Sequence, residues 1–169
     1  GEYHYMGESH GAGDTVRLIF EEDGEWVGLM TWAAACYALK PRDERIGWNH
    51  AMRRLRLKLV VNNRRSCILA RAGARPNLAS QLLGLAIREL PAIWKAKWGY
   101  VPLLAETFCD IERVAGTCYR AAGWEEVGKT KGITRSRQTR NYYIATGRPN
   151  VRYLKPLRKN DWELIVSND

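Results

Sequence analysis

The chain lacks paired cysteines and long hydrophobic runs, two features that mark many secreted and membrane proteins. Its four cysteines never stand in a Cys-x-x-Cys spacing; they are Cys36, Cys67, Cys109 and Cys118. We expect them to be reduced, mostly buried thiols of a cytosolic protein. No run of about eighteen apolar residues occurs, and the N-terminus has neither an apolar run nor a twin-arginine signal. These absences argue against secretion and membrane spanning and predict a cytoplasmic protein.

The chain is long enough for one domain with a real core and short for two, since it has 169 residues. We therefore expect a single domain over residues 1–169. The first residue is Gly1 and not methionine, so a missing N-terminal portion, or a processed or engineered start, is compatible with this expectation.

Acidic residues are absent from one long basic stretch. Residues 129–159 hold ten basic side chains and no acidic one, and residues 40–75 hold eleven basic against two acidic ones. These two blocks carry +10 and +9, whereas the rest of the chain carries −10, for a net charge of +9. Two basic blocks on an acidic body are expected of a polyanion binder, with DNA as the favoured partner. The alternative is a pair of solvated faces that only keep the protein soluble.

Hydrophobic periodicity predicts a mixed α/β chain with a central sheet. Residues 2–13 are expected to form a loop or the end of a helix, and residues 15–32 a β-hairpin with an acidic turn. Expected helices lie at 33–39, within 40–63 as a basic amphipathic helix, at 78–89 and from 116 onward. Asn77 is the expected N-cap of the third helix, and Pro91 breaks or kinks it before residues 93–98 carry on as another turn or two. Expected strands lie at 66–70, up to 105 and at 124–127, followed by a mobile loop at 129–140 and closing strands at 141–144 and 151–157 that pair with each other.

Residues 103–124 combine a short buried strand, two carboxylates and a helix that carries a tyrosine. Glu106 and Asp110 follow the strand at its C-terminal edge, where α/β sheets tend to bind ligands, and Tyr119 lies on the helix behind them. Two carboxylates beside a tyrosine suit acid, base or metal chemistry. A structural alternative remains for each residue. Glu106 is then a buried acid paired with an arginine, Asp110 a loop residue and Tyr119 a core aromatic.

His4 and Tyr5 stand out in the polar segment at the start of the chain. Histidine is the side chain best suited to proton transfer or metal binding near neutral pH, whereas a histidine near a terminus is often merely exposed. Iron or another divalent metal fits this residue set, but scattered ligand types do not define a metal site.

The order of elements resembles that of the GCN5-related acetyltransferases, which have a mixed central sheet flanked by helices. In that family a glycine-rich turn before a helix holds the pyrophosphate of acyl-CoA on backbone N–H groups. The corresponding turn here spans residues 71–80, with Arg71, Arg75, Asn77 and Ser80 as the candidate cofactor-binding residues. It has one glycine, and Pro76 removes a donor, so acetyl-CoA is disfavoured as a cofactor.

Seven motifs in the same order resemble the Druantia DruA family, which is associated with anti-phage defence loci and insertion elements. They are HYMG (4–7), RD with IGW (42–48), VNNR (61–64), NLAS (77–80), ETF (106–108), GTCYRAA with Trp124 (116–124) and GKTKG (128–132). The chain departs from the family pattern at Gly123 and at Ile133 and Thr134. A weaker likeness extends to Mom-type DNA-modification enzymes, and it implies that His4, Tyr5, Asp110 and Tyr119 gather at one pocket.

The favoured hypothesis is an enzyme that acts on a nucleobase or a nucleic-acid end, through a basic surface, stacking aromatics and an acid/base cluster. Trp48, Trp124 and Tyr119 are the stacking candidates. The catalytic candidates are His4, Tyr5, Glu106, Asp110 and Tyr119. The nucleic-acid-binding candidates are Arg42, Arg53, Arg54, Arg56, Arg64, Arg65, Lys129, Lys131, Arg135, Arg137 and Arg140.

Two other functions remain open. One is a non-catalytic DNA-binding subunit that works beside a helicase or transposase and uses the fold only as a scaffold. The other is an acyl-CoA-dependent transferase that acts on a protein or small molecule, which the turn at residues 71–80 disfavours.

Overall fold

The computed structural model describes residues 2–6, 13–37, 39–69, 75–110, 116–130, 133–135, 143–145 and 150–167, of which residues 2–6, 110, 130, 133–135 and 143–145 are described by backbone only. Its elements are β1 (Glu2–Met6), β2 (Thr15–Glu22), β3 (Glu25–Ala34), α1 (Lys40–Ile46), α2 (His50–Arg56), the 3-10 turn η1 (Leu57–Leu59), β4 (Val60–Ile68), α3 (Leu78–Trp98), β5 (Leu104–Asp110), α4 (Thr117–Ala121), β6 (Glu125–Thr130), β7 (Ile133–Arg135), β8 (Tyr143–Ala145), β9 (Asn150–Pro156) and α5 (Asp161–Val166).

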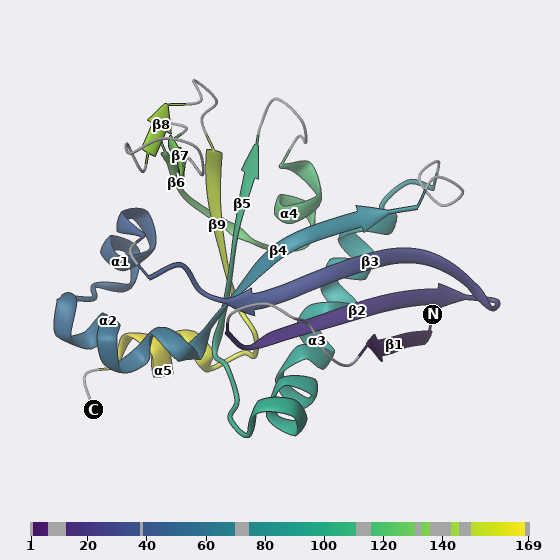
Figure 1. Cartoon of the computed structure of the whole chain (residues 1–169), viewed down its shortest axis with the longest axis horizontal. Helices are drawn as coiled ribbons and strands as arrows, with labels where there is room; N and C mark the ends of the chain where they lie inside the picture. Colours follow the sequence, from purple (N-terminus) through teal and green to yellow (C-terminus); the bar gives the residue numbers. More distant parts are fainter. Residues whose placement is uncertain are drawn as a thin grey trace.

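A seven-stranded sheet in the order β1-β2-β3-β4-β5-β9-β6 forms the centre of the molecule (Figure 1). All neighbouring strands are antiparallel except β4 and β5, which run parallel. The predicted mixed sheet flanked by helices is therefore confirmed. The strands β7 and β8 form a separate two-stranded ribbon.

The two faces of the sheet belong to two different hydrophobic cores, because side chains alternate between the faces along each strand. Val61 and Ala105 pack in a core with helices α3 and α4. Their neighbours Val60 and Leu104 pack in a second core with residues of α1, α2 and α5, including Ile165. Figure 1 shows α1, α2 and α5 gathered at one end of the sheet.

The parallel strands β4 and β5 stay together only over a short distance. They pair from Val60 with Leu104 to Asn63 with Thr107, and beyond these pairs the strands part (Figure 1). Strand β4 continues beside β3 up to Ile68, whereas β5 continues beside β9. The sheet therefore opens between β4 and β5.

Helix α3 joins the predicted helix at 78–89 and the helical turns predicted at 93–98 into one element. It runs from Leu78 to Trp98 and ends at Gly99, whose φ of 82° is the left-handed conformation typical of a helix C-terminus. Pro91 lies inside it and is buried, as are Leu90 and Trp94. Of the two expectations for Pro91, a break or a kink, the break is wrong, because packing of this buried stripe outweighs the hydrogen bond that proline removes.

The ends of several predicted elements also differ. Residues 2–6 form an edge strand rather than a loop, and residues 33–34 complete β3 instead of starting a helix. The expected basic helix is divided into α1 and α2, because Gly47 adopts a left-handed φ of 85° and the Asn49 side chain accepts a hydrogen bond of 2.8 Å from the Met52 amide and caps α2. Asn77 has a φ of 63° and does not cap α3 with its side chain.

The C-terminal strands pair differently from the prediction. Strand β9 lies between β5 and β6, and β8 pairs with β7, so residues 141–144 and 151–157 do not form a hairpin. Part of the expected loop at 129–140 is strand, at the end of β6 and in β7. In the described part of the chain, no helix is long and apolar enough to cross a membrane.

Candidate functional site

A cavity of about 490 Å³ opens where β4 and β5 part. Its walls come from the second half of β4, the end of β5, the start of α3 and the helix α4. The lining residues include Tyr119, Arg64 and Arg65, so the structure brings together one predicted catalytic residue and two predicted nucleic-acid-binding residues.

Hydroxyl and amide groups form a connected cluster in this cavity. The Tyr119 hydroxyl donates a hydrogen bond of 3.0 Å to Asn63 Oδ1, and the Ser66 hydroxyl donates one of 2.9 Å to the same oxygen. Thr107 Oγ1 donates to the Asn63 carbonyl at 3.1 Å. The cluster exists because Asn63 and Thr107 are register partners at the point where the strands part.

The tyrosine of this cluster is held in its neutral form. Tyr119 is buried, and burial raises the pKa of its hydroxyl. The ring is fixed by Tyr153, stacked at 5.5 Å between centroids, and by Trp124, edge-on at 5.3 Å. At neutral pH such a phenol is a fixed hydrogen-bond donor and a potential general acid.

Positive charge and an exposed aromatic ring border the cavity. Arg64 and Arg65 are exposed on β4, and Phe108 on β5 is 40% exposed. The Arg152 guanidinium, from β9, lies over the Phe108 ring at 4.7 Å from its centroid. Arg152 and Phe108 were not among the sequence-based candidates. Only the pairing of residue 108 with residue 152 across β5 and β9 reveals them.

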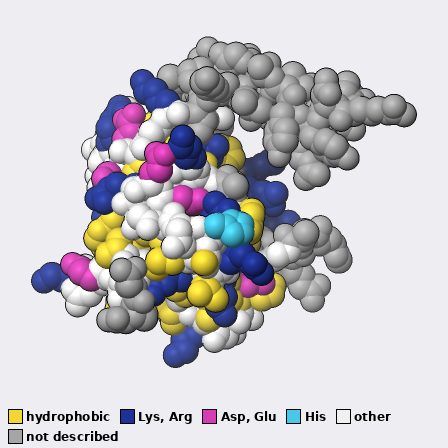
Figure 2. Space-filling model, turned by 90° about the vertical axis from the view of Figure 1, so that its left-hand side faces the viewer, with side chains coloured by type: hydrophobic (Ala, Val, Ile, Leu, Met, Phe, Trp, Pro, Cys, Tyr) yellow, Lys and Arg dark blue, Asp and Glu magenta, His cyan; other side chains and the backbone are white. Residues whose placement is uncertain are grey.

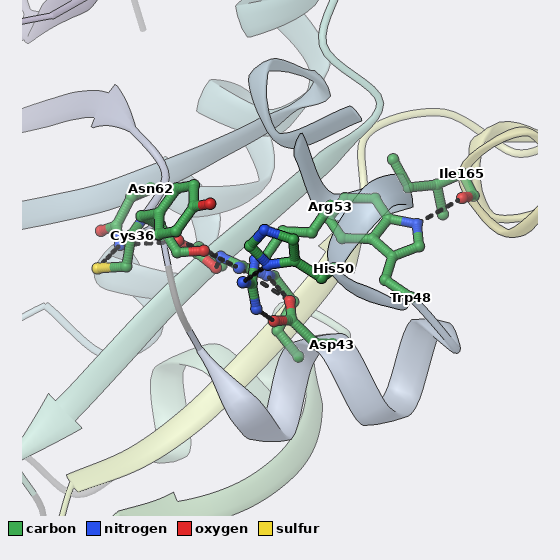
Figure 3. Close-up of polar contacts among 10 residues, drawn as sticks. Cys36, Asp43, Trp48, His50, Arg53, Asn62 and Ile165 are labelled. Atoms are coloured by element: carbon green, nitrogen blue, oxygen red, sulfur yellow. Dashed lines mark hydrogen bonds and ion pairs between the residues drawn. The ribbon is translucent and has the colours of Figure 1, made fainter. Parts of the chain in front are cut away.

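Glu106 lies on the opposite face of the sheet, in a buried network. Figure 3 shows other members of this network, among them Cys36, Asp43, Arg53 and Asn62. Glu106 is 1% exposed, and its Oε2 accepts a hydrogen bond of 2.9 Å from Arg42 Nη1. Its Oε1 accepts from Asn62 Nδ2 at 3.1 Å and from the Cys36 amide at 3.0 Å. Both oxygens are therefore occupied, as in the alternative of a buried acid paired with an arginine.

Arg42 is the centre of this network. Its side chain is fully buried, and besides Glu106 it contacts Asp43 at 2.9 Å and donates to the Cys36 carbonyl at 2.7 Å. The prediction that Arg42 contacts phosphates is wrong, because the guanidinium faces the interior. It instead attaches α1 to the sheet.

The three arginines of α2 have different surroundings. Arg53 donates to Asp43 Oδ2 at 2.9 Å, lies over the Tyr37 ring, and has its pKa raised chiefly by the bond to Asp43. Arg56 donates to the Ile165 carbonyl at 3.2 Å. Arg54 is exposed. Figure 2 shows that basic side chains on this side of the molecule are interspersed with acidic and hydrophobic ones, so α2 does not present an unbroken basic surface.

His4 and Tyr5 do not gather with Tyr119. They lie on the edge strand β1, four strands away from β5, which is about 19 Å at the usual strand spacing. Asp110 is the last residue of β5, next to Cys109, which lines the cavity, and only its backbone is described. The expectation that His4 and Tyr5 share a pocket with Tyr119 is therefore wrong. It failed because no sequence signal gives the place of β1 in the sheet.

The remaining sequence-based candidates are spread over several places. Trp48 and Trp124 are buried in the two cores and offer no stacking surface. Lys129 is exposed on β6. Arg135 lies on β7, where only the backbone is described, and Arg71, Lys131, Arg137 and Arg140 lie outside the described residues. Where side chains are described, no three His, Cys, Asp or Glu residues lie together as a metal-binding group would.

A second cavity, of about 270 Å³, lies at the N-terminus of α3 and contains three of the candidate cofactor residues. Arg75, Asn77 and Ser80 line it together with Thr117 and Cys118 at the start of α4. Arg75 forms an ion pair with Glu22, and Ser80 Oγ donates to the Asn77 carbonyl at 2.9 Å.

Comparison with solved structures defines the class of the fold. An acetyltransferase of the GNAT family from Streptococcus pneumoniae is 17% identical, with 84% of this chain and 66% of that one covered and a TM-score of 0.50. The aminoglycoside acetyltransferase AAC(6')-Ib, in complex with coenzyme A and kanamycin, is 15% identical, with 90% and 72% covered and a TM-score of 0.51. A ribosomal-protein-alanine N-acetyltransferase from Brucella melitensis is 12% identical, with 84% and 68% covered and a TM-score of 0.52.

These likenesses show the acetyltransferase fold, and this chain spans about two thirds of the length of those proteins. Within that class, the Druantia protein DruA family matches residues 1–161. The chain belongs to this family, which confirms the resemblance seen in the motifs. A comparison with curated proteins gives no match. Neither the family match nor the similar structures support the weaker likeness to Mom-type enzymes.

Proposed function

We propose that this protein is an enzyme that acts on a nucleobase or a nucleic-acid end held in the cavity between β4 and β5. The observation that carries the proposal is the joint presence in one cavity of the buried Tyr119 hydroxyl and of Arg64 and Arg65. Membership of the DruA family, which is associated with anti-phage defence, agrees with nucleic acid as the substrate.

The composition of the cavity suits a base. Enzymes that act on a nucleobase take it out of the stack and hold it by hydrogen bonds and by contact with aromatic side chains. Tyr119, Ser66 and Thr107 supply hydroxyl groups. Phe108 also lines the cavity and supplies an exposed ring, on the face of β5 that carries Glu106. Each exposed ring can stack on any base, so this contact is independent of sequence.

The charge at the entrance suits the nucleic-acid backbone. Arg64 and Arg65 follow each other on β4, are exposed and border the cavity. Guanidinium groups bind phosphate through charge-assisted, bidentate hydrogen bonds. These two residues, rather than Arg42 or Arg53, are the phosphate contacts we expect from the first basic block.

Tyr119 is the proposed proton donor. Because burial raises its pKa, the phenol carries its proton at neutral pH and can donate it, or a hydrogen bond, to an atom that gains negative charge in the reaction. Asn63 holds the hydroxyl in one orientation until a substrate replaces this contact.

The test compares Tyr119→Phe with a matched control, Tyr100→Phe. Both substitutions remove a hydroxyl that donates one hydrogen bond, since Tyr100 donates to Asp14 at 2.7 Å, far from the cavity. We expect Tyr119→Phe to abolish base modification in DNA, measured by mass spectrometry of nucleosides from cells that express the protein, while DNA affinity stays near that of the wild type. The control should keep both properties.

The same experiment separates catalysis from a scaffold function. If Tyr119→Phe retains full modification or full phage protection, the catalytic role is wrong, and the protein is a DNA-binding subunit that works beside a helicase or transposase. If Arg64→Gln with Arg65→Gln binds DNA as the wild type does, the cavity is not the nucleic-acid site.

Acyl-CoA-dependent transfer is a second candidate. The observation in its favour is the cavity at the start of α3, together with the likeness to an acetyltransferase solved with coenzyme A. A helix N-terminus favours phosphate groups. Acetyl-CoA should then raise the melting temperature of the wild type, and Ser80→Ala should reduce this shift. No shift at millimolar acetyl-CoA would exclude this candidate.

A further inference from the structure

The charges around Glu106 are balanced in pairs, with one exception. The carboxylates of Asp43 and Glu106 face the guanidinium groups of Arg42 and Arg53 in ion pairs of 2.9 Å. Two negative and two positive charges therefore compensate each other. The guanidinium of Arg152 is a third positive charge beside this network.

Arg152 forms no ion pair in the part of the chain that the structure describes. It is partly buried, and its Nε is buried without a hydrogen-bond partner. Its guanidinium lies over the ring of Phe108, a residue that lines the cavity. Burial lowers its pKa, although Cys36 and Glu106 act against this change. A desolvated cation without a partner is costly in a folded protein unless a ligand compensates it.

Arg64 approaches the same place from β4. A β-bulge interrupts the alternation of side chains here, since Asn63 pairs with Trp32 and Arg65 with Thr31, and Arg64 is the extra residue between them. Arg64 lines the cavity together with Phe108. The charges of both Arg64 and Arg152 lower the pKa of the Cys36 thiol, against the larger effect of burial. Arg64 thus lines the cavity together with the ring that the Arg152 guanidinium covers, and both charges act on the same thiol.

We infer that Arg152 and Arg64 form an anion subsite beside Phe108, which binds the phosphate of a nucleotide whose base contacts the Phe108 ring. This inference rests on the proposed function and specifies how that cavity selects its substrate. An aromatic ring next to two guanidinium groups matches a nucleotide, because it offers one surface for the base and one for the phosphate. A free nucleoside lacks the second contact.

The test uses the full chain with Arg152→Gln, Arg152→Lys and the control Arg88→Gln. Arg88 is an exposed arginine on α3, so its replacement removes the same charge far from Phe108. Affinity for a fluorescein-labelled single-stranded DNA is measured by anisotropy at several NaCl concentrations. Binding of thymidine 5′-monophosphate, thymidine and inorganic pyrophosphate is measured by the shift in melting temperature.

We expect Arg152→Gln to weaken binding of the DNA about tenfold, as loss of one charge-assisted contact does, and to lower the salt slope by about 0.7. Arg152→Gln should also abolish the rise in melting temperature that thymidine 5′-monophosphate gives. Thymidine has no phosphate, so its shift in melting temperature should be no larger with the wild type than with the variant. Arg152→Lys should lie between them, because it keeps the charge without the planar fork. The control should match the wild type.

The possible results separate this inference from the proposed function. If the wild type binds DNA and Arg152→Gln binds it with the same affinity and slope, the subsite is wrong and the proposed function stands. If no DNA binds, but pyrophosphate stabilises the wild type and not Arg152→Gln, the subsite is right as a phosphate site and the proposed function is wrong. If neither DNA, mononucleotide nor pyrophosphate binds the wild type, both are wrong.

Discussion

Replacing Glu106 with glutamine tests whether this residue is structural or catalytic. In the wild type, Oε2 accepts from Arg42, and Oε1 accepts from Asn62 and the Cys36 amide. A glutamine has one oxygen and one NH₂ group, so at least one buried donor must face another donor. The fully buried guanidinium of Arg42 also loses one of its two carboxylate partners and keeps only Asp43.

The size of the effect follows from that burial. Breaking a buried ion pair by removing one partner costs about 3–5 kcal/mol, because the other charge remains without compensation. For a protein of this length each kcal/mol shifts the melting temperature by roughly 2–4 °C, so we expect Glu106→Gln to lower it by roughly 6–20 °C. Glu44→Gln is the matched control, since Glu44 forms an exposed ion pair with Lys40, and exposed pairs contribute about 0–1 kcal/mol.

The assay is urea denaturation followed by tryptophan fluorescence, together with nucleoside analysis under conditions where the variant is folded. We expect a large loss of stability and retained modification in the folded variant. A loss of stability below about 1 kcal/mol would contradict the account of the buried network. A stable variant without activity would make Glu106 catalytic, as the first sequence-based hypothesis had it.

Three further predictions concern stability. Arg53→Gln should lower the melting temperature, because it removes a partner of the network, whereas Arg54→Gln should leave it within about 2 °C, as exposed positions do. Burial raises the pKa of Tyr100 to about 12. The stability that its neutral hydroxyl contributes is therefore complete below the pKa of tyrosine in the unfolded chain, near 10, and is lost as the pH rises towards 12. Tyr100→Phe should therefore lose less melting temperature than the wild type between pH 9 and pH 12. Gly116→Ala should destabilise the protein by about 1–3 kcal/mol in urea denaturation, as overpacking does, because its Cβ would lie 2.8 Å from Tyr153 Cζ; a variant as stable as the wild type would contradict this.

Local features of the site could be read from the sequence because they depend on short stretches. A buried strand that ends in a carboxylate and precedes a short helix was visible in residues 103–124, and so was the choice between a catalytic and an ion-paired Glu106. The hairpin of β2 and β3 followed from alternating apolar residues around an acidic turn. The start of α3 at Leu78 was predicted from Asn77 as N-cap, and the helix begins there although the Asn77 side chain does not cap it.

Long-range pairing could not be read from the sequence. Strand β9 lies between β5 and β6, and only this order brings Arg152 over Phe108. The same limit applies within α2, where Arg53 and Arg54 are neighbours in sequence. One faces Asp43 and the other faces solvent, and the pattern of apolar residues did not say which face of the helix meets the sheet.

The most direct test of the central claim is hydrogen–deuterium exchange with and without a saturating single-stranded DNA. If the substrate lies between β4 and β5, exchange should slow in peptides that cover residues 64–68 and 116–121, and remain unchanged in those that cover residues 50–56. Slower exchange confined to residues 50–56, with none along the second half of β4, would contradict the claim that this cavity is the nucleic-acid site.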